Sequence, residues 1–184
     1  MYARKLMPVP ERMSPGVVWD AAELARAVDE IERNPEAVIA AVQDLDASVL
    51  RYKPNPQKWC VLEIMAHLAD VELVYGFRLR QIIAQPGSII TPIDQDEWAR
   101  ALNYTNASVP ELIELYRVNR RANVRLLREL TVADLTKAAY HPEYEGDFSL
   151  ADLLKFMRGH DPNHLRQIER LKAQAKAQSV GAQQ

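Results

Sequence analysis

The sequence predicts an all-α fold, a single domain built as a four-helix bundle. Three observations predict it: four long stretches carry apolar residues at helical spacing, prolines separate these stretches, and no segment shows a convincing strand pattern. The 184 residues suffice for one domain with a substantial core. We expect that core to span residues 20–172, with residues 1–19 as a peripheral N-terminal arm and residues 173–184 as a fraying C-terminal tail.

The charge balance argues against several classes of protein. The 23 Lys and Arg residues nearly cancel the 25 Asp and Glu residues, so no global field attracts nucleic acid or an anionic membrane. Residues 1–20 contain no continuous apolar block and predict neither a signal peptide nor a membrane anchor. We therefore expect a soluble, cytoplasmic protein. Cys60 is the only cysteine, which excludes an intrachain disulfide and a multi-thiolate metal site.

The first two helices are predicted over residues 20–46 and 59–84. In the first, Asn34-Pro35 places a capping residue before a proline suited to a first turn, which leaves open whether the helix is broken at Asn34. The prolines of residues 53–58 predict a loop before the second helix. One side of that second helix carries Ile64, His67, Leu68, Val71, Val74 and Tyr75.

A long crossover is predicted between the second and third helices. Pro86-Gly87 ends the second helix, and roughly twenty residues pass before the third begins. A short helix over residues 94–101 shortens the irregular part of this connection. The third helix is predicted over residues 108–130, with Asn119 and Asn123 interrupting its apolar seam.

The fourth helix is predicted to begin after Ser149, which can cap it. It follows a loop that contains His141. Its inner stripe consists of Leu153, Met157, His160, His164, Ile168 and Leu171.

Three of the four histidines stand where a metal ion would need them. His160 and His164 are one helical turn apart, so their side chains project from the same face, about 6 Å apart along the axis. His67, on a facing helix, would complete a three-histidine site with a position left open. One histidine on an apolar stripe is better explained as a hydrogen-bonded core residue. Two adjacent buried imidazoles without a shared ion would be desolvated twice, so we predict metal binding.

Pro162 stands between two of these histidines. It removes a backbone donor and crowds the carbonyl group of Arg158. We therefore expect a local kink or bulge at residues 159–162. A wide opening there would prevent His160 and His164 from sharing an ion.

Five further residues are candidates for positioning the metal ligands or binding substrate. Glu63 and Asp70 lie about one turn on either side of His67, although acidic residues on bundle helices are more often solvated. Asp161 is rotated by about 100° from His160, so we expect it to support the ligands or to lie at an interface rather than to bind the metal.

Asn119 and His141 complete the candidates. Asn119, with Asn123, can bind substrate at the bundle centre or fix the register of the helices. His141 either approaches the mouth of the pocket from its loop or is an exposed residue without a role.

Three segments resemble the DinB superfamily. Residues 59–72 resemble its Trp, Glu and His-Leu helix, and residues 159–168 its terminal His-Asp-x-x-His helix. Residues 141–146 are similar to the His-Pro-x-x-Gly turn of many members, and Arg120-Arg121 falls in the expected third helix. The resemblance spans about residues 30–172.

The resemblance implies a four-helix bundle of up-down-down-up connectivity, which the long crossover fits. It implies a divalent ion, zinc or nickel, bound by His67, His160 and His164. Characterised relatives include transferases of low-molecular-weight thiols and a thiol-dependent isomerase, whereas others are named only as metal-dependent hydrolases. We therefore expect a homodimeric metalloenzyme that acts on a small molecule, with a low-molecular-weight thiol as one candidate partner.

Two reaction classes suit such a site. An ion held by three neutral imidazoles keeps its double charge and would acidify a bound thiol or water molecule near neutral pH. The first class is thiol transfer to an electrophile, and the second is hydrolysis. The alternative is a non-catalytic helical binding protein whose metal is structural or absent, with a closed coordination sphere and no adjoining cavity.

Overall fold

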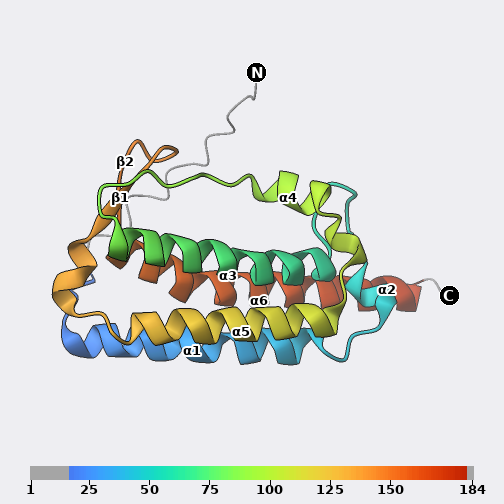
Figure 1. Ribbon diagram of the computed structural model, residues 1–184. Coiled ribbons are helices and arrows are strands. Elements are labelled where there is room, and N and C mark those ends of the chain that lie inside the picture. Colours follow the sequence, from blue (N-terminus) through green and yellow to red (C-terminus); the bar gives the residue numbers. More distant parts are fainter. Residues whose placement is uncertain (1–16, 182–184) are drawn as a thin grey trace, which may run out of the picture.

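Four long helices form the centre of the computed structural model, which describes residues 17–181 (Figure 1). They are α1 (Ala21–Val42), α3 (Val61–Ala84), α5 (Val109–Leu127) and α6 (Leu150–Gly181). Helices α1 and α6 run in one direction and α3 and α5 in the other, which confirms the up-down-down-up bundle. None of the described helices combines the length and the hydropathy needed to cross a bilayer.

The predicted ends of the domain are tested by the structure only at the C-terminal side. Most of the predicted N-terminal arm lies outside the described residues. The predicted fraying from residue 173 is wrong, because α6 stays helical to Gly181. The alanines, glutamines and lysines of this segment are good helix formers, and their propensity suffices to extend a helix that the bundle has already nucleated.

Side chains at the helix starts explain where the helices begin. The Asp20 carboxylate accepts a hydrogen bond from the backbone N–H of Glu23 at 2.7 Å and caps α1. The predicted cap of α6 is confirmed, since Ser149 Oγ accepts from the N–H of Asp152 at 3.2 Å. The Asp152 carboxylate in turn accepts from the backbone N–H of Ser149 at 3.0 Å. The side chain of each residue thus accepts a hydrogen bond from the backbone of the other.

The long crossover runs along α3 before α5 begins (Figure 1). It contains α4 (Gln95–Ala101), which confirms the predicted short helix, and the 3₁₀ turn η1 (Tyr104–Asn106). The hydroxyl of Tyr104 donates to the Asp70 carboxylate of α3 at 2.6 Å. This bond fixes the end of the crossover against the bundle.

A small hairpin corrects the prediction that the chain has no strands. β1 (Ala138–His141) pairs antiparallel with β2 (Gly146–Ser149). Strands of four residues are too short to show an alternating pattern in the sequence. The backbone of Tyr140 also bonds to Ser88 and Ile90 of the crossover, so tertiary pairing supports the hairpin. The two remaining short elements are α2 (Ala47–Leu50) and η2 (Val132–Thr136).

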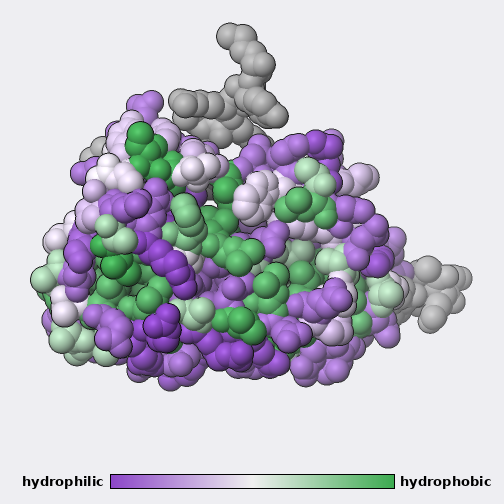
Figure 2. All heavy atoms as spheres, in the orientation of Figure 1, coloured by the Kyte–Doolittle hydropathy of each residue, from purple (hydrophilic) through white to green (hydrophobic). Residues whose placement is uncertain are grey.

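A buried polar layer lies between the two large clusters of the apolar core, and a third, small cluster joins α3 to the crossover. The cluster at the hairpin end includes Val28, Leu79, Leu127 and Met157, and the cluster at the opposite end includes Ile39, Met65, Tyr116 and Ile168. Between them, each of the four long helices contributes polar groups. Figure 2 shows that apolar side chains also lie at the surface over the middle of the molecule, whereas the edge formed by α1 is mainly hydrophilic.

Arg120 of α5 is the centre of this polar layer. Its guanidinium contacts Glu72 of α3 at 2.7 Å and Asp161 of α6 at 2.8 Å, and it also donates to the carbonyl oxygen of Ile31 in α1. Asn123 donates to Glu72 at 3.1 Å. Burial opposes the charge of Arg120, but the two carboxylates outweigh this effect and raise its pKa above the ordinary value. One guanidinium therefore joins all four helices.

Two prolines lie inside helices without breaking them. Pro35 follows Asn34 in α1, which is continuous across the predicted break point. A proline leaves the carbonyl group four residues earlier without its helical donor. For Pro35 this is the carbonyl of Ile31, which receives the Arg120 bond instead.

The second proline corrects the prediction of a bulge at residues 159–162. Helix α6 is α-helical through Pro162. The carbonyl group that Pro162 leaves free belongs to Arg158, and the side-chain amide of Asn34 donates to it at 3.1 Å. A side chain of α1 thus replaces the missing backbone donor of α6.

Candidate metal centre

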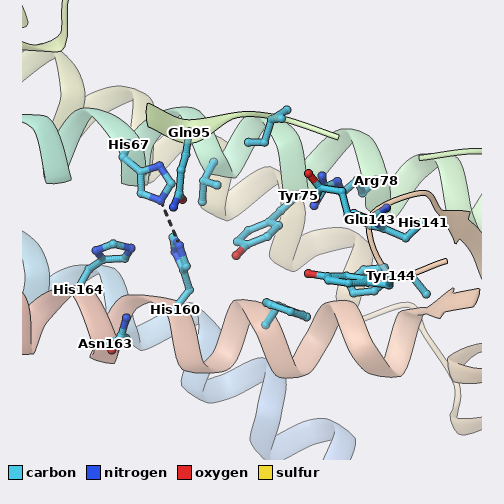
Figure 3. Close-up of a pocket in the computed structure, with 14 residues that line it drawn as sticks. His67, Tyr75, Arg78, Gln95, His141, Glu143, Tyr144, His160, Asn163 and His164 are labelled. Carbon is cyan, nitrogen blue, oxygen red and sulfur yellow. Dashed lines mark hydrogen bonds between the residues drawn. The ribbon is translucent and has the colours of Figure 1, made fainter. Parts of the chain in front are cut away.

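His67 of α3 and His160 and His164 of α6 converge between their two helices (Figure 3). Their possible ligand nitrogens all lie within 4.8 Å of one another, and the Nε2 atoms of His67 and His160 are 3.2 Å apart. Two nitrogens bound tetrahedrally to zinc at about 2.1 Å would be about 3.4 Å apart. The three imidazoles therefore fit one shared ion.

The continuity of α6 places two of these ligands. Because the helix keeps its regular spacing through Pro162, the rings of His160 and His164 lie 4.5 Å apart between centroids. The ring of His67 lies 5.2 Å from the first and 5.1 Å from the second. The bond from Asn34 to α6 supports the turn that carries both histidines.

A hydrogen bond orients the third histidine. His164 Nδ1 lies 3.0 Å from the amide oxygen of Gln167, which can only accept, so Nδ1 carries the proton and Nε2 is free to bind a metal. Gln167 was not predicted, although its position three residues after His164 was an available signal. His160 Nδ1 is buried without a hydrogen-bond partner among the described residues.

Burial keeps these imidazoles neutral. Desolvation, and then the charge of His164, lowers the pKa of His67 to about 3. Burial and the two neighbouring histidines hold the pKa of His160 well below its ordinary value, and burial also lowers the pKa of His164. Neutral imidazole is the form that binds metal ions. The cluster is therefore ready to bind a cation at neutral pH.

A pocket of about 290 Å³ adjoins the cluster. At its far end lie Arg78, Glu143 and His141 (Figure 3). We call Tyr144, Phe148 and Phe156, whose rings pack on one another beside the pocket, the aromatic wall. The full lining consists of His67, Val71, Tyr75, Arg78, Ile93, Gln95, His141, Glu143, Tyr144, Phe148, Phe156, His160, Asn163 and His164.

Of the five predicted candidates, His141 is the one that lines this pocket. It is 2% exposed, its ring stacks on Tyr144 at 4.2 Å, and burial lowers its pKa to about 4. Asn119 does not line the pocket, and its Nδ2 is buried without a partner in the described part of the chain.

The three carboxylates among the candidates have structural partners. Glu63 accepts from the N–H of Cys60 at 2.8 Å and from Lys53 at 2.8 Å, so it caps α3. Asp70 accepts from a tyrosine of the crossover. Asp161 pairs with Arg120 in the buried polar layer and does not line the pocket.

Tyr75 and Arg78 are pocket residues to which the sequence reasoning gave no role. They follow His67 by 8 and 11 residues, which at 3.6 residues per turn places them on its helical face. The rings of Tyr75 and His160 are nearly perpendicular, with the centroids 5.7 Å apart. The spacing was a usable signal for both residues.

The comparisons with known proteins agree with this fold and this cluster. The sequence model of the DinB superfamily matches residues 30–168. A protein of Oceanobacillus iheyensis named "putative metal-dependent hydrolase" is 28% identical over 144 residues, which cover 78% of this chain and 83% of that protein. One of the same name from Bacillus mycoides is 27% identical over 145 residues, covering 79% and 83%.

A solved structure shares the fold. YfiT from Bacillus subtilis, described as "a probable metal-dependent hydrolase with an unusual four-helix bundle topology", superposes with a TM-score of 0.81 at 21% identity. The superposition covers 87% of this chain and 91% of that one. The family match extends over most of the bundle and includes the three clustered histidines. The chain therefore belongs to the DinB superfamily.

Proposed function

We propose that this protein is a metal-dependent enzyme whose His67, His160 and His164 hold one divalent ion, zinc or nickel, beside a small-molecule pocket. The observation that carries the proposal is the convergence of three imidazoles within 4.8 Å at one end of that pocket. Imidazole nitrogens suit both metals. The names of the relatives, which describe metal-dependent hydrolases, support the same class of activity.

Such an ion, when bound, would supply the charge that makes a water molecule or a thiol nucleophilic near neutral pH. The surrounding residues would bind and orient the other reactant. Burial raises the pKa of Tyr75 above its ordinary value, so its hydroxyl keeps its proton and can donate a hydrogen bond next to His160. Gln95 and Asn163 add neutral amide groups to the lining.

The adjoining pocket favours an enzyme over a purely structural metal site. A structural site is closed by four protein ligands, whereas catalytic sites keep a position open. Within the described residues the cluster contains three ligands and borders a pocket of about 290 Å³. A small substrate therefore has room beside the proposed ion.

Metal analysis tests the site. After incubation with zinc or nickel and removal of free metal, we expect one ion per chain by mass spectrometry of the metal content. His164→Ala should lose this ion. His141→Ala is the matched control, because it removes a pocket histidine outside the cluster and should keep the metal. Wild-type protein without stoichiometric metal, or His164→Ala with full occupancy, would refute the proposal.

Activity assays separate the two reaction classes. The metal-loaded protein is incubated with ester and amide substrates, and separately with a low-molecular-weight thiol and a panel of electrophiles. Turnover that a chelator abolishes and that needs no thiol indicates hydrolysis, whereas turnover only with the thiol indicates transfer. Metal-loaded protein that is inactive in both panels would favour the non-catalytic alternative.

A further inference from the structure

Arg78 is a cation in the pocket that forms no ion pair with any residue the structure describes. It lies three helical turns from His67 on the same face of α3 (Figure 3). Its Nη2 donates to the carbonyl oxygen of Thr91 at 3.4 Å, a long hydrogen bond, and its Nε is buried without a partner. Among the described residues no carboxylate lies within ion-pair distance of it.

Two other arginines that are at least partly buried form ion pairs with acidic residues. Arg120 lies between two carboxylates in the polar layer, and Arg158 pairs with Glu23 and Glu30. A desolvated guanidinium without such partners is unfavourable. Burial lowers the pKa of Arg78, but an arginine keeps its proton in proteins. The charge of Arg78 therefore stays in the pocket, and no ion pair within residues 17–181 compensates it.

The rest of the pocket indicates what kind of anion would fit. The aromatic wall offers flat apolar surface beside Arg78, and His141 stacks on it. The volume of about 290 Å³ suits a molecule of about one ring with a short chain. Glu143 lines the same end and acts on Arg78 through its charge, without reaching ion-pair distance.

We propose that Arg78 binds the carboxylate of the substrate, whose planar apolar body lies along the aromatic wall and whose reacting group faces the three histidines. Only the position of the reacting group beside the three histidines rests on the proposed function; the binding of the carboxylate by Arg78 does not. A guanidinium forms two parallel hydrogen bonds with a carboxylate. A phosphate dianion would call for further cations, and Arg78 is the one Lys or Arg residue in the described lining. The pocket thus favours a monocarboxylate.

Calorimetric titration with a matched series of probes tests the proposal. The probes are benzoate, phenylacetate and 3-phenylpropanoate, each paired with its carboxamide. Because a carboxylate also binds zinc, every titration is done at pH 8 with the zinc-loaded protein and again with chelator present. We expect at least one carboxylate to bind roughly 10- to 100-fold more tightly than its amide in both conditions, as expected for a charge-assisted hydrogen-bonded pair.

Variants assign the preference to Arg78. Arg78→Gln should abolish it, and Arg78→Lys should keep part of it because the charge remains. Arg125→Gln removes the same charge from an exposed position of α5 and should leave the preference unchanged. Glu143→Gln should strengthen carboxylate binding severalfold, because it removes a like charge from the same end. Circular dichroism checks that each variant is folded.

The possible outcomes decide the proposal. It is overturned if wild-type protein binds no carboxylate more tightly than the matching carboxamide, or if Arg78→Gln keeps the preference for the carboxylate. Tighter Arg78-dependent binding of phenyl phosphate would also overturn it, in favour of a phosphate ligand. The titrations with chelator do not need the ion, so they remain informative if the metal proposal fails. If Arg78→Gln does not fold, Arg78→Lys and Glu143→Gln still give opposite expected shifts.

Discussion

Replacing Arg120 with methionine should remove the connection between the four helices while keeping a similar side-chain length. The substitution leaves the carboxylates of Glu72 and Asp161 buried without their cation, and it frees the carbonyl group of Ile31. Removing one partner of a buried ion pair costs about 3–5 kcal/mol. Since Arg120 is 3% exposed and serves two carboxylates, we expect the upper half of this range. Total stability is about 5–15 kcal/mol, so the loss is a large fraction of it.

Urea denaturation followed by circular dichroism measures this loss. With a urea dependence of about 2–3 kcal/mol per molar, a loss of about 4–5 kcal/mol should lower the midpoint by about 1.3–2.5 M. The control combines Arg120→Met with Glu72→Gln and Asp161→Asn, which removes the unpaired charges and should recover part of the stability. A loss below about 1 kcal/mol for the single variant, or a triple variant less stable than the single one, would refute the reasoning.

Three further predictions concern the metal centre, the hairpin and the helical prolines. Gln167→Leu removes the acceptor that orients His164, so zinc affinity measured by competition with a chromophoric chelator should fall roughly 10- to 100-fold; unchanged affinity would contradict this role. Burial lowers the pKa of His141 from 6.5 to about 4 in the folded protein. As pH falls from 6.5 towards 4, the unfolded chain therefore binds a proton that the folded protein does not, and the free energy of unfolding decreases. His141→Phe should therefore reduce the slope of unfolding free energy against pH in that window by up to about 1.4 kcal/mol per pH unit, and an identical slope would count against it. Asn34→Leu should destabilise wild-type protein by about 1–3 kcal/mol but much less in the presence of Pro162→Ala, which restores the backbone donor; equal effects in the double-mutant cycle would show that the bond does not replace that donor.

The sequence predicted the bundle well because its helices follow a local rule. Apolar residues at helical spacing and the prolines between them located the starts of the four helices within about two residues, and the length of the crossover agreed with the connectivity. The hairpin was missed because its strands of four residues depend on pairing with each other and with the crossover. The pairing with the crossover joins segments about 50 residues apart and leaves no periodic signal.

The candidate site was predictable in part for a similar reason. The three histidines combine a spacing within one helix with one residue on a facing helix, and the structure brings them together. Acidic neighbours in the sequence were weaker guides, because Glu63 caps a helix and Asp161 pairs across the core. Arg78 lies on the face of His67, yet its importance comes from the lack of a carboxylate within ion-pair distance in the described fold, which spacing does not reveal.

Pro162 shows most clearly how tertiary structure changes a local expectation. When only the backbone donors of the same helix are considered, a proline leaves one carbonyl group without a hydrogen bond. A proline between two ligands is therefore expected to distort the turn. Here the carbonyl group that Pro162 leaves free accepts a bond from Asn34, just as the carbonyl group that Pro35 leaves free accepts one from Arg120. Each proline thus creates a backbone acceptor that a neighbouring helix uses. The two bonds tie α1 to α6 and to α5, and the first of them supports the turn in which His160 and His164 keep the spacing that a shared ion requires.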